Sequence, residues 1–94
     1  MAKVTVLYWQ DIPSVVEASD GEGKAKTQLS QRCQELIDLV AMKKGLAGTD
    51  AYLEQWSKGT PAERDGSAEE AASAAAQEFE DRYEQIRKDE LAKC

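Results

Sequence analysis

Two stretches typical of β-strands lie close together near the start of the chain, and the short segment between them constrains the fold. Residues 3–9 and 14–19 are rich in β-branched and aromatic side chains, which favour extended backbone. The intervening residues 10–13 end in Ile12-Pro13, a pair typical of a turn. So short a connection cannot cross over to a parallel strand, so residues 3–19 are expected to form an antiparallel β-hairpin.

Two helices are expected to follow the hairpin. The segment "DGEG" ends the second strand, and residues 24–44 then place apolar side chains at helical spacing. Gly45 is suited to end that helix. Residues 50–57 contain "AYLEQW", whose apolar side chains also share one face, so they are expected to form a short helix. The stripe of the first helix consists of Leu29, Cys33, Leu36, Ile37, Val40 and Ala41.

The remainder of the chain is expected to be a loop and one long helix. Residues 57–66 are rich in Gly, Ser, Thr and charged side chains, which is typical of a mobile loop. Ser67 and Glu70 form a capping box at the start of a helix over residues 67–92. At about 1.5 Å per residue, that helix would be a rod of roughly 37 Å. Its end would then project from one small domain or pack against another chain.

The fold class that follows is α+β. Residues 1–94 are expected to form a single domain, in which an N-terminal antiparallel β-hairpin packs against three helices, the last of them long and partly projecting.

The charge is unevenly distributed and argues against two classes of partner. The net charge is −6, and residues 49–94 carry all of it, because acidic and basic residues balance over residues 1–48. A chain with this field is repelled by phosphate backbones and by anionic membrane surfaces. The sequence therefore predicts no nucleic-acid and no membrane partner.

The absence of histidine argues against an enzyme. Histidine is the commonest general base and a common zinc ligand, and the chain contains none. Cys33 and Cys94 are not spaced like a metal motif or a disulfide framework. Cys33 lies on the apolar stripe and is expected in the core, whereas Cys94 is expected to be exposed. With no long apolar segment at the N-terminus, the prediction is a cytoplasmic protein with no catalytic residue, no metal and no cofactor.

The segment "YWQDIP" contains the favoured candidate site. Tyr8 and Trp9 are adjacent on a strand and therefore point to opposite faces, so they cannot both enter the same core. Two interpretations remain open, because these residues either shape the hairpin or form a binding surface. On the second interpretation, Tyr8, Trp9, Asp11 and Ile12 bind a protein partner or a second copy of the chain, beside the unpaired edge of the hairpin.

A second candidate site lies in the segment "SDGEGKAKTQ". The spacing of its glycines fits neither a phosphate-binding P-loop nor a dinucleotide-binding motif. If a helix begins at residue 24, however, its free N–H groups would lie beside two lysine charges. The alternative function is therefore a small anion- or metabolite-binding protein that uses Gly23, Lys24 and Lys26.

Several segments resemble one family of small bacterial proteins. "KVTVLYWQDIPS", the loop "GKAK", Ala41-Met42 and "TDAYLEQW" are together similar to the virulence-factor domain family, over most of residues 3–56. Larger relatives join this domain to helical-repeat and iron–sulfur-scaffold-like segments, so the resemblance implies an accessory or adaptor role in metabolism. The resemblance implies no catalytic motif and assigns no catalytic or metal-binding residue. The function that we expect is a non-enzymatic interaction or regulatory domain.

Overall fold

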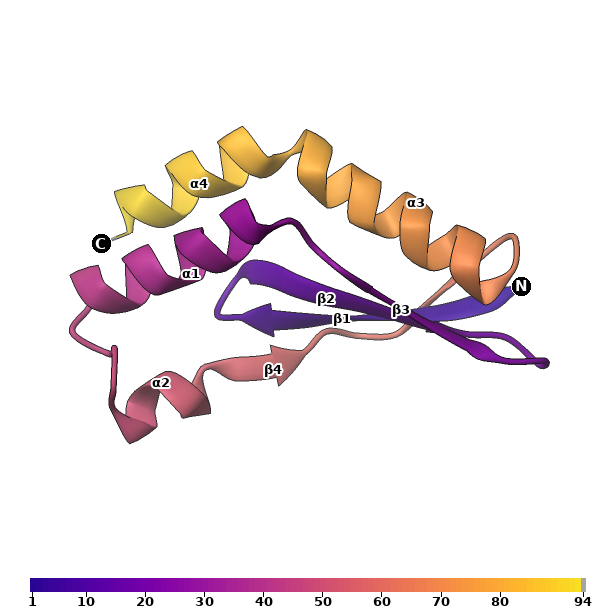
Figure 1. The fold of residues 1–94 in the computed structure, drawn as a ribbon, viewed down its shortest axis with the longest axis horizontal. Helices are drawn as coiled ribbons and strands as arrows, with labels where there is room; N and C mark the ends of the chain where they lie inside the picture. The colour runs from indigo at the N-terminus through magenta and orange to yellow at the C-terminus, as the bar shows by residue number, and fades with distance from the viewer. Residues whose placement is uncertain (94) are drawn as a thin grey trace.

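A computed structural model describes residues 1–93 and confirms the α+β class. One antiparallel sheet, with the strand order β3-β2-β1-β4, packs against helices (Figure 1). A further strand, β5, also pairs with β1. Cys94, which was expected to be exposed, lies outside the described residues. The elements in chain order are β1 (Ala2–Trp9), β2 (Ile12–Ser19), β3 (Lys24–Gln28), α1 (Gln31–Lys43), α2 (Asp50–Glu54), β4 (Trp56–Lys58), β5 (Ala62–Arg64), α3 (Ala68–Asp81) and α4 (Tyr83–Ala92).

The predicted hairpin is present and is formed by β1 and β2. The two strands pair in antiparallel register, with Val6 opposite Val16 and Trp9 opposite Ile12. The turn is shorter than expected, because Ile12-Pro13 belongs to β2. Gln10 adopts a positive φ of 55° in this turn, a conformation that few residues other than glycine adopt. Its N–H donates to the carbonyl oxygen of Gln55 at 3.0 Å, which holds the turn in place.

The hairpin is extended on both sides by strands that were predicted as other structure. Residues 24–28, expected to be the first turns of a helix, form β3 and pair with β2. Residues 57–66, expected to be a loop, contain most of β4 and all of β5, and both strands pair with β1. In β3, exposed and half-buried side chains alternate along the strand, which is the period of a strand rather than of a helix. The predictions of a helix over residues 24–44 and a short helix over residues 50–57 were therefore too long.

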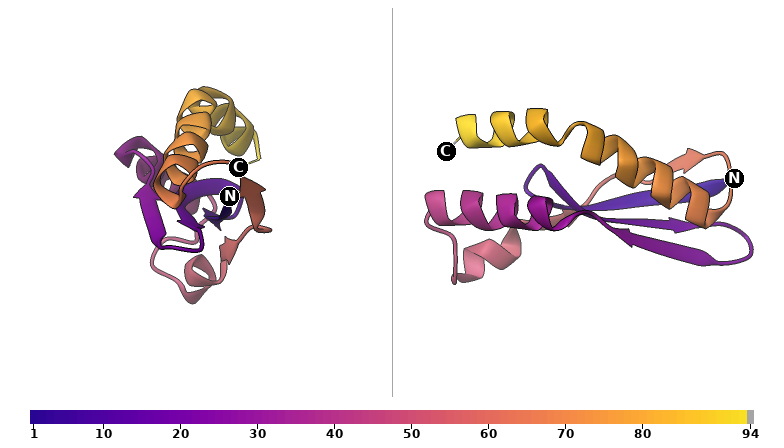
Figure 2. Two further views of the ribbon diagram at one scale, coloured as in Figure 1. Left: turned by 90° about the vertical axis from the view of Figure 1, so that its right-hand side faces the viewer. Right: turned by 45° about the horizontal axis from the view of Figure 1, so that its top comes forward.

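The predicted C-terminal rod is divided into two helices. The chain leaves helical geometry at Arg82, where φ is −100° and ψ is 7°. Before this point α3 lies on the sheet, and after it α4 lies beside α1 (Figures 1 and 2). Tyr83, Ile86 and Leu91 of α4 pack against the buried residues of α1. A straight helix would carry these apolar side chains away from α1, so the bend allows them to be buried.

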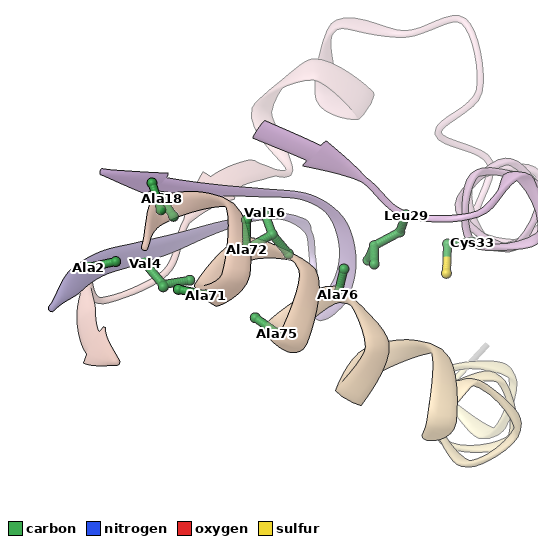
Figure 3. Close-up of a cluster of buried hydrophobic side chains, with 11 residues drawn as sticks. Ala2, Val4, Val16, Ala18, Leu29, Cys33, Ala71, Ala72, Ala75 and Ala76 are labelled. Carbon is green, nitrogen blue, oxygen red and sulfur yellow. The ribbon is translucent and has the colours of Figure 1, made fainter. Parts of the chain in front are cut away.

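The interior contains two apolar clusters. In the first, alanines of α3 pack on the strands (Figure 3). Because alanine side chains are short, the helix approaches the sheet closely. The second cluster lies at the hairpin turn, where α1 packs on Trp9 and Ile12. The first cluster contains Ala2, Val4, Val16, Ala18, Leu29, Cys33, Ala68, Ala71, Ala72, Ala75 and Ala76, and the second contains Trp9, Ile12, Leu36, Ile37, Val40 and Ala41.

Asp20 connects the β2–β3 turn to the start of α3. Its Oδ2 accepts a hydrogen bond from the N–H of Ala68 at 2.8 Å, and its Oδ1 accepts from the N–H groups of Glu22 and Gly23 at 2.8 Å each. The Ala68 N–H, followed by the Glu22 N–H, holds the pKa of Asp20 below its ordinary value of 3.8, because both donors favour the charged carboxylate. The charged Asp20 carboxylate therefore stabilises the fold fully above pH 3.8, and this stabilisation is lost as the pH falls through the lower pKa of Asp20 in the folded state.

We expect Asp20→Asn to lower the melting temperature at neutral pH, since an amide nitrogen would face a backbone donor. The difference in melting temperature between the variant and wild type should become smaller as the pH falls below 3.8. Thermal unfolding followed by circular dichroism across this range measures both effects. Glu22→Gln removes the same charge from the neighbouring exposed position and serves as the control. A constant difference at all pH values would show that the Asp20 carboxylate does not link these elements.

Candidate functional site

Trp9 and Ile12, which were predicted to bind a partner, are core residues. Both side chains are 0% exposed, so their assignment to a binding surface was wrong. The Trp9 Nε1 group donates to the carbonyl oxygen of Tyr52 at 2.9 Å, and the two rings lie 5.4 Å apart between centroids. The physical reason is that both faces of β1 are covered near the turn. Tyr8 and Trp9 do point to opposite sides of β1, and other residues of the chain pack on each side.

Tyr8 and Asp11 are not buried, and they contact different helices, Tyr8 the helix α3 and Asp11 the end of α4. The half-buried ring of Tyr8 meets that of Phe79 edge to face, with 6.1 Å between centroids. Asp11 is exposed in the hairpin turn and forms an ion pair with Lys93, with 3.1 Å between Oδ2 and Nζ. Of the two interpretations of "YWQDIP", the structure supports the one in which these residues shape the hairpin.

The unpaired strand edge predicted for the hairpin lies on β3 instead. One side of β1 pairs with β2 and the other with β4 and β5. The outer side of β2 pairs with β3. Among residues 1–93, β3 pairs only with β2, so it forms one margin of the sheet (Figure 2).

The hydrogen bonds at both ends of the β2–β3 pair show which main-chain groups face outward. The Leu29 N–H donates to the Ser14 carbonyl at 3.0 Å, and the Asp20 N–H donates to the Gly23 carbonyl at 2.9 Å. In an antiparallel pair, alternate residues direct both N–H and C=O toward the neighbouring strand. Residues 23, 25, 27 and 29 therefore face β2, whereas the main-chain groups of Lys24, Lys26 and Gln28 point away from the sheet.

The side chains of Lys24 and Lys26 lie on the sheet face opposite α3. The register places Lys24 beside Ser19 and Lys26 beside Glu17, and Lys3 of β1 lies beyond Ser19. A shallow, open hollow of about 400 Å³ lies over these strands, and it brings together three lysines from two strands. The residues that line it are Lys3, Thr5, Glu17, Ala18, Ser19, Lys24, Ala25 and Lys26.

The lysines of β3 have no ion-pair partner among the described residues. Glu17, which lies beside Lys26, is paired with Lys58 of β4, with 3.8 Å between Oε2 and Nζ. This face is therefore locally positive on a chain whose net charge is −6. A small anion or an acidic chain would be attracted to it.

The helix N-terminus proposed as part of the anion site is elsewhere and is occupied. Lys24 and Lys26 belong to a strand, and the Gly23 N–H donates to Asp20. The helix α1 begins after Ser30, where Glu80 accepts hydrogen bonds from the Ser30 N–H at 3.0 Å and from its hydroxyl at 2.9 Å. Burial acts to raise the pKa of Glu80, but the Ser30 donors and Arg32 hold it below 4.5. The charged Glu80 thus already occupies the position that an anion would take.

Cys33 lies in the first core cluster, as expected. Burial, together with the nearby Glu80 carboxylate, raises the pKa of its thiol above the ordinary value of 9.0. Both effects disfavour the thiolate, which is the nucleophilic form. Within residues 1–93, no three side chains of His, Cys, Asp or Glu lie close enough to hold a metal ion.

The fold and the site together define a small α+β domain whose sheet ends in an open, lysine-bearing strand. The chain belongs to the family described as Virulence factor, which it matches over residues 7–92. This confirms the resemblance and extends it through the C-terminal helices. No curated protein and no solved structure matches the chain. None of the helices within residues 1–93 is long and apolar enough to cross a bilayer.

Proposed function

We propose that this member of the Virulence factor family is a non-catalytic interaction domain that binds an extended segment of a partner protein at the open edge of β3. The observation that carries this proposal is the one-sided pairing of β3, which leaves outward main-chain groups at Lys24, Lys26 and Gln28. An extended peptide aligned there would continue the sheet by one strand. Binding of this kind draws affinity from main-chain hydrogen bonds and specificity from alternate side chains.

The exposure of β3 supports this edge over the other margins of the sheet. The side chains of Lys24, Lys26 and Gln28 are all exposed, and the strand is five residues long. On the other margin, β4 and β5 are three residues long each and are separated by Gly59–Pro61. Short and interrupted strands are poor templates for a further strand. The edge of β3 therefore offers a longer continuous row of main-chain donors and acceptors.

The absence of an evident catalytic group supports the non-enzymatic part of the proposal. The sequence contains no histidine, and the Cys33 thiol is buried, with a pKa raised above its ordinary value by that burial. A free thiol that serves as a core residue also fits a reducing compartment, so we place the activity in the cytoplasm. The role is then that of an adaptor or regulator, which acts by holding a partner.

Gln28→Pro tests the edge directly, because proline lacks the N–H that would bind an added strand. This N–H points away from β2, so the substitution removes no bond between β2 and β3. In affinity capture from a lysate of the native organism, we expect Gln28→Pro to recover about tenfold less partner than wild type. Gln28→Thr keeps the N–H and is the matched control, which should recover as much partner as wild type.

Circular dichroism and the melting temperature establish that both variants are folded before they are compared. Equal recovery of the same partners by wild type and Gln28→Pro would overturn binding at this edge. Loss of the partner by Gln28→Thr as well would show that the side chain, rather than the outward N–H, is recognised.

A second candidate function is the binding of a small anion in the hollow over the sheet. It is favoured by Lys3, which joins Lys24 and Lys26 around that hollow. In this form the site is a lysine cluster on a sheet face rather than a helix N-terminus. Without main-chain donors directed into the hollow, the lysines would act as mobile point charges. The edge of β3 is therefore the stronger proposal.

A further inference from the structure

We infer that the partner segment carries two acidic residues separated by one residue, an acid-x-acid motif in extended conformation. This inference rests on the proposed strand addition at β3 and specifies what the added strand contains. It is drawn from the positions of Lys24 and Lys26, which are two residues apart on one strand and therefore project from the same face.

The spacing of the motif follows from the geometry of neighbouring strands. Residues directly opposite each other on adjacent antiparallel strands have Cβ atoms about 4.5–5.5 Å apart. The residues opposite Lys24 and Lys26 are themselves two apart and lie on the face opposite α3. Carboxylates at both positions would each meet one lysine of β3.

The intervening residue of the motif faces the other side of the sheet. Ala25 and Thr27 point to that side and are half-buried, and Ala25 packs against the first core cluster beneath α3. A neighbouring side chain there would lie beside this apolar surface. A small or β-branched residue, such as valine or threonine, suits this position and also favours extended backbone.

The same charges disfavour a second copy of this chain as the occupant. If two β3 strands paired in antiparallel register about their centres, Lys26 would lie opposite the Lys26 of the other copy. Like charges directly opposite each other destabilise a strand pair. Exposed lysines commonly protect edge strands from self-association. Pairing of β3 with the β3 of a second copy is therefore disfavoured, and pairing with an acidic segment of another protein is favoured.

Synthetic peptides of equal composition provide the test. The peptide Thr-Val-Glu-Val-Glu-Val-Thr has the proposed spacing, and its isomer Thr-Val-Glu-Glu-Val-Val-Thr places the same glutamates on opposite faces. Fluorescence anisotropy of labelled, end-capped peptides gives the dissociation constants. The first peptide can form two exposed cross-strand ion pairs and its isomer only one, so the first should bind about fivefold more tightly, and added salt should reduce this preference.

Charge reversal provides the complementary arm. The double substitution Lys24→Glu and Lys26→Glu should reverse the preference, so that Thr-Val-Lys-Val-Lys-Val-Thr binds more tightly than the acidic peptide. Lys43→Glu together with Lys88→Glu makes the same change of charge at exposed positions of α1 and α4, and should leave the preference for the acidic peptide unchanged.

The outcomes separate this inference from the proposed function. If both glutamate peptides bind equally and Gln28→Pro weakens both, strand addition stands and the acid-x-acid motif is overturned. If Gln28→Pro binds the Glu-Val-Glu peptide as tightly as wild type does, the proposed strand addition is overturned and the lysines recognise charge alone. If wild type binds neither peptide, the result counts against both the proposed strand addition and the acid-x-acid motif.

Discussion

Trp9→Ala should lower the free energy of unfolding by about 3–5 kcal/mol. The Trp9 ring is 0% exposed and belongs to the second core cluster, so its removal leaves a large cavity between the hairpin turn and α1. The substitution also leaves the carbonyl oxygen of Tyr52 without the indole donor that lies 2.9 Å away. Domains of this size have only about 5–15 kcal/mol of stability, so the variant should be close to unfolding at room temperature.

Urea denaturation followed by far-UV circular dichroism measures this loss, because Trp56 would complicate a fluorescence signal. Trp9→Phe keeps an aromatic ring and loses the N–H donor, so it should be less destabilising than Trp9→Ala. Tyr8→Ala is a matched comparison on the same strand, because Tyr8 is only half-buried. A loss of less than about 1 kcal/mol for Trp9→Ala would contradict the role of Trp9 as a core residue. If Trp9→Ala then also failed to bind a partner, the loss would show that Trp9 contacts the partner, because the variant would still be folded.

The hairpin and α1 were predictable because their signals are local. β-Branched and aromatic residues define β1 and β2, and the short connection between them allows only an antiparallel pair. The stripe from Cys33 to Ala41 identifies the buried face of α1 in the same way. In both cases the residues that determine the element are neighbours in the sequence. The prediction needs no knowledge of what packs against them.

The strands that extend the hairpin are determined by distant partners. The segment "KAKTQ" contains two lysines and an alanine, which are poor strand formers, and its pairing with β2 decides its conformation. In β4, Trp56 pairs with Trp9, which is far away in the sequence. Because β3, β4 and β5 were not predicted, both edges of the hairpin were expected to be open, and one side of Trp9 was expected to be uncovered. The error in the candidate site therefore follows from the missing sheet partners.

The division of the C-terminal helix is also a tertiary effect. No proline or glycine lies between Ser67 and Lys93, so the local sequence predicts one continuous helix. The bend at Arg82 instead brings Tyr83 and Ile86 against α1. The guanidinium of Arg32 in α1 lies 4.3 Å from the centre of the Tyr83 ring, a further contact across this junction. Packing between the helices thus overrides the local preference for a straight rod.

Ala72→Leu should lower the free energy of unfolding by about 1–3 kcal/mol, the usual cost of inserting a larger side chain into a packed core. Ala72 is 0% exposed and lies on the face of α3 that rests on the sheet (Figure 3). Its neighbours on that face are also alanines, so α3 sits too close to the strands to admit a branched side chain. Urea denaturation of wild type and variant measures the change.

Ala74→Leu is the matched control, since Ala74 lies on the exposed face of the same helix and has no strand beneath it. This substitution should change the stability by less than about 0.5 kcal/mol. If Ala72→Leu were equally neutral, close packing would not be what holds α3 on the sheet. Because α3 contacts both β2 and β3, a displaced helix would also shift the edge strand. A folded Ala72→Leu variant should therefore bind the Glu-Val-Glu peptide more weakly than Ala74→Leu does, which connects the alanine-rich core to the proposed binding edge.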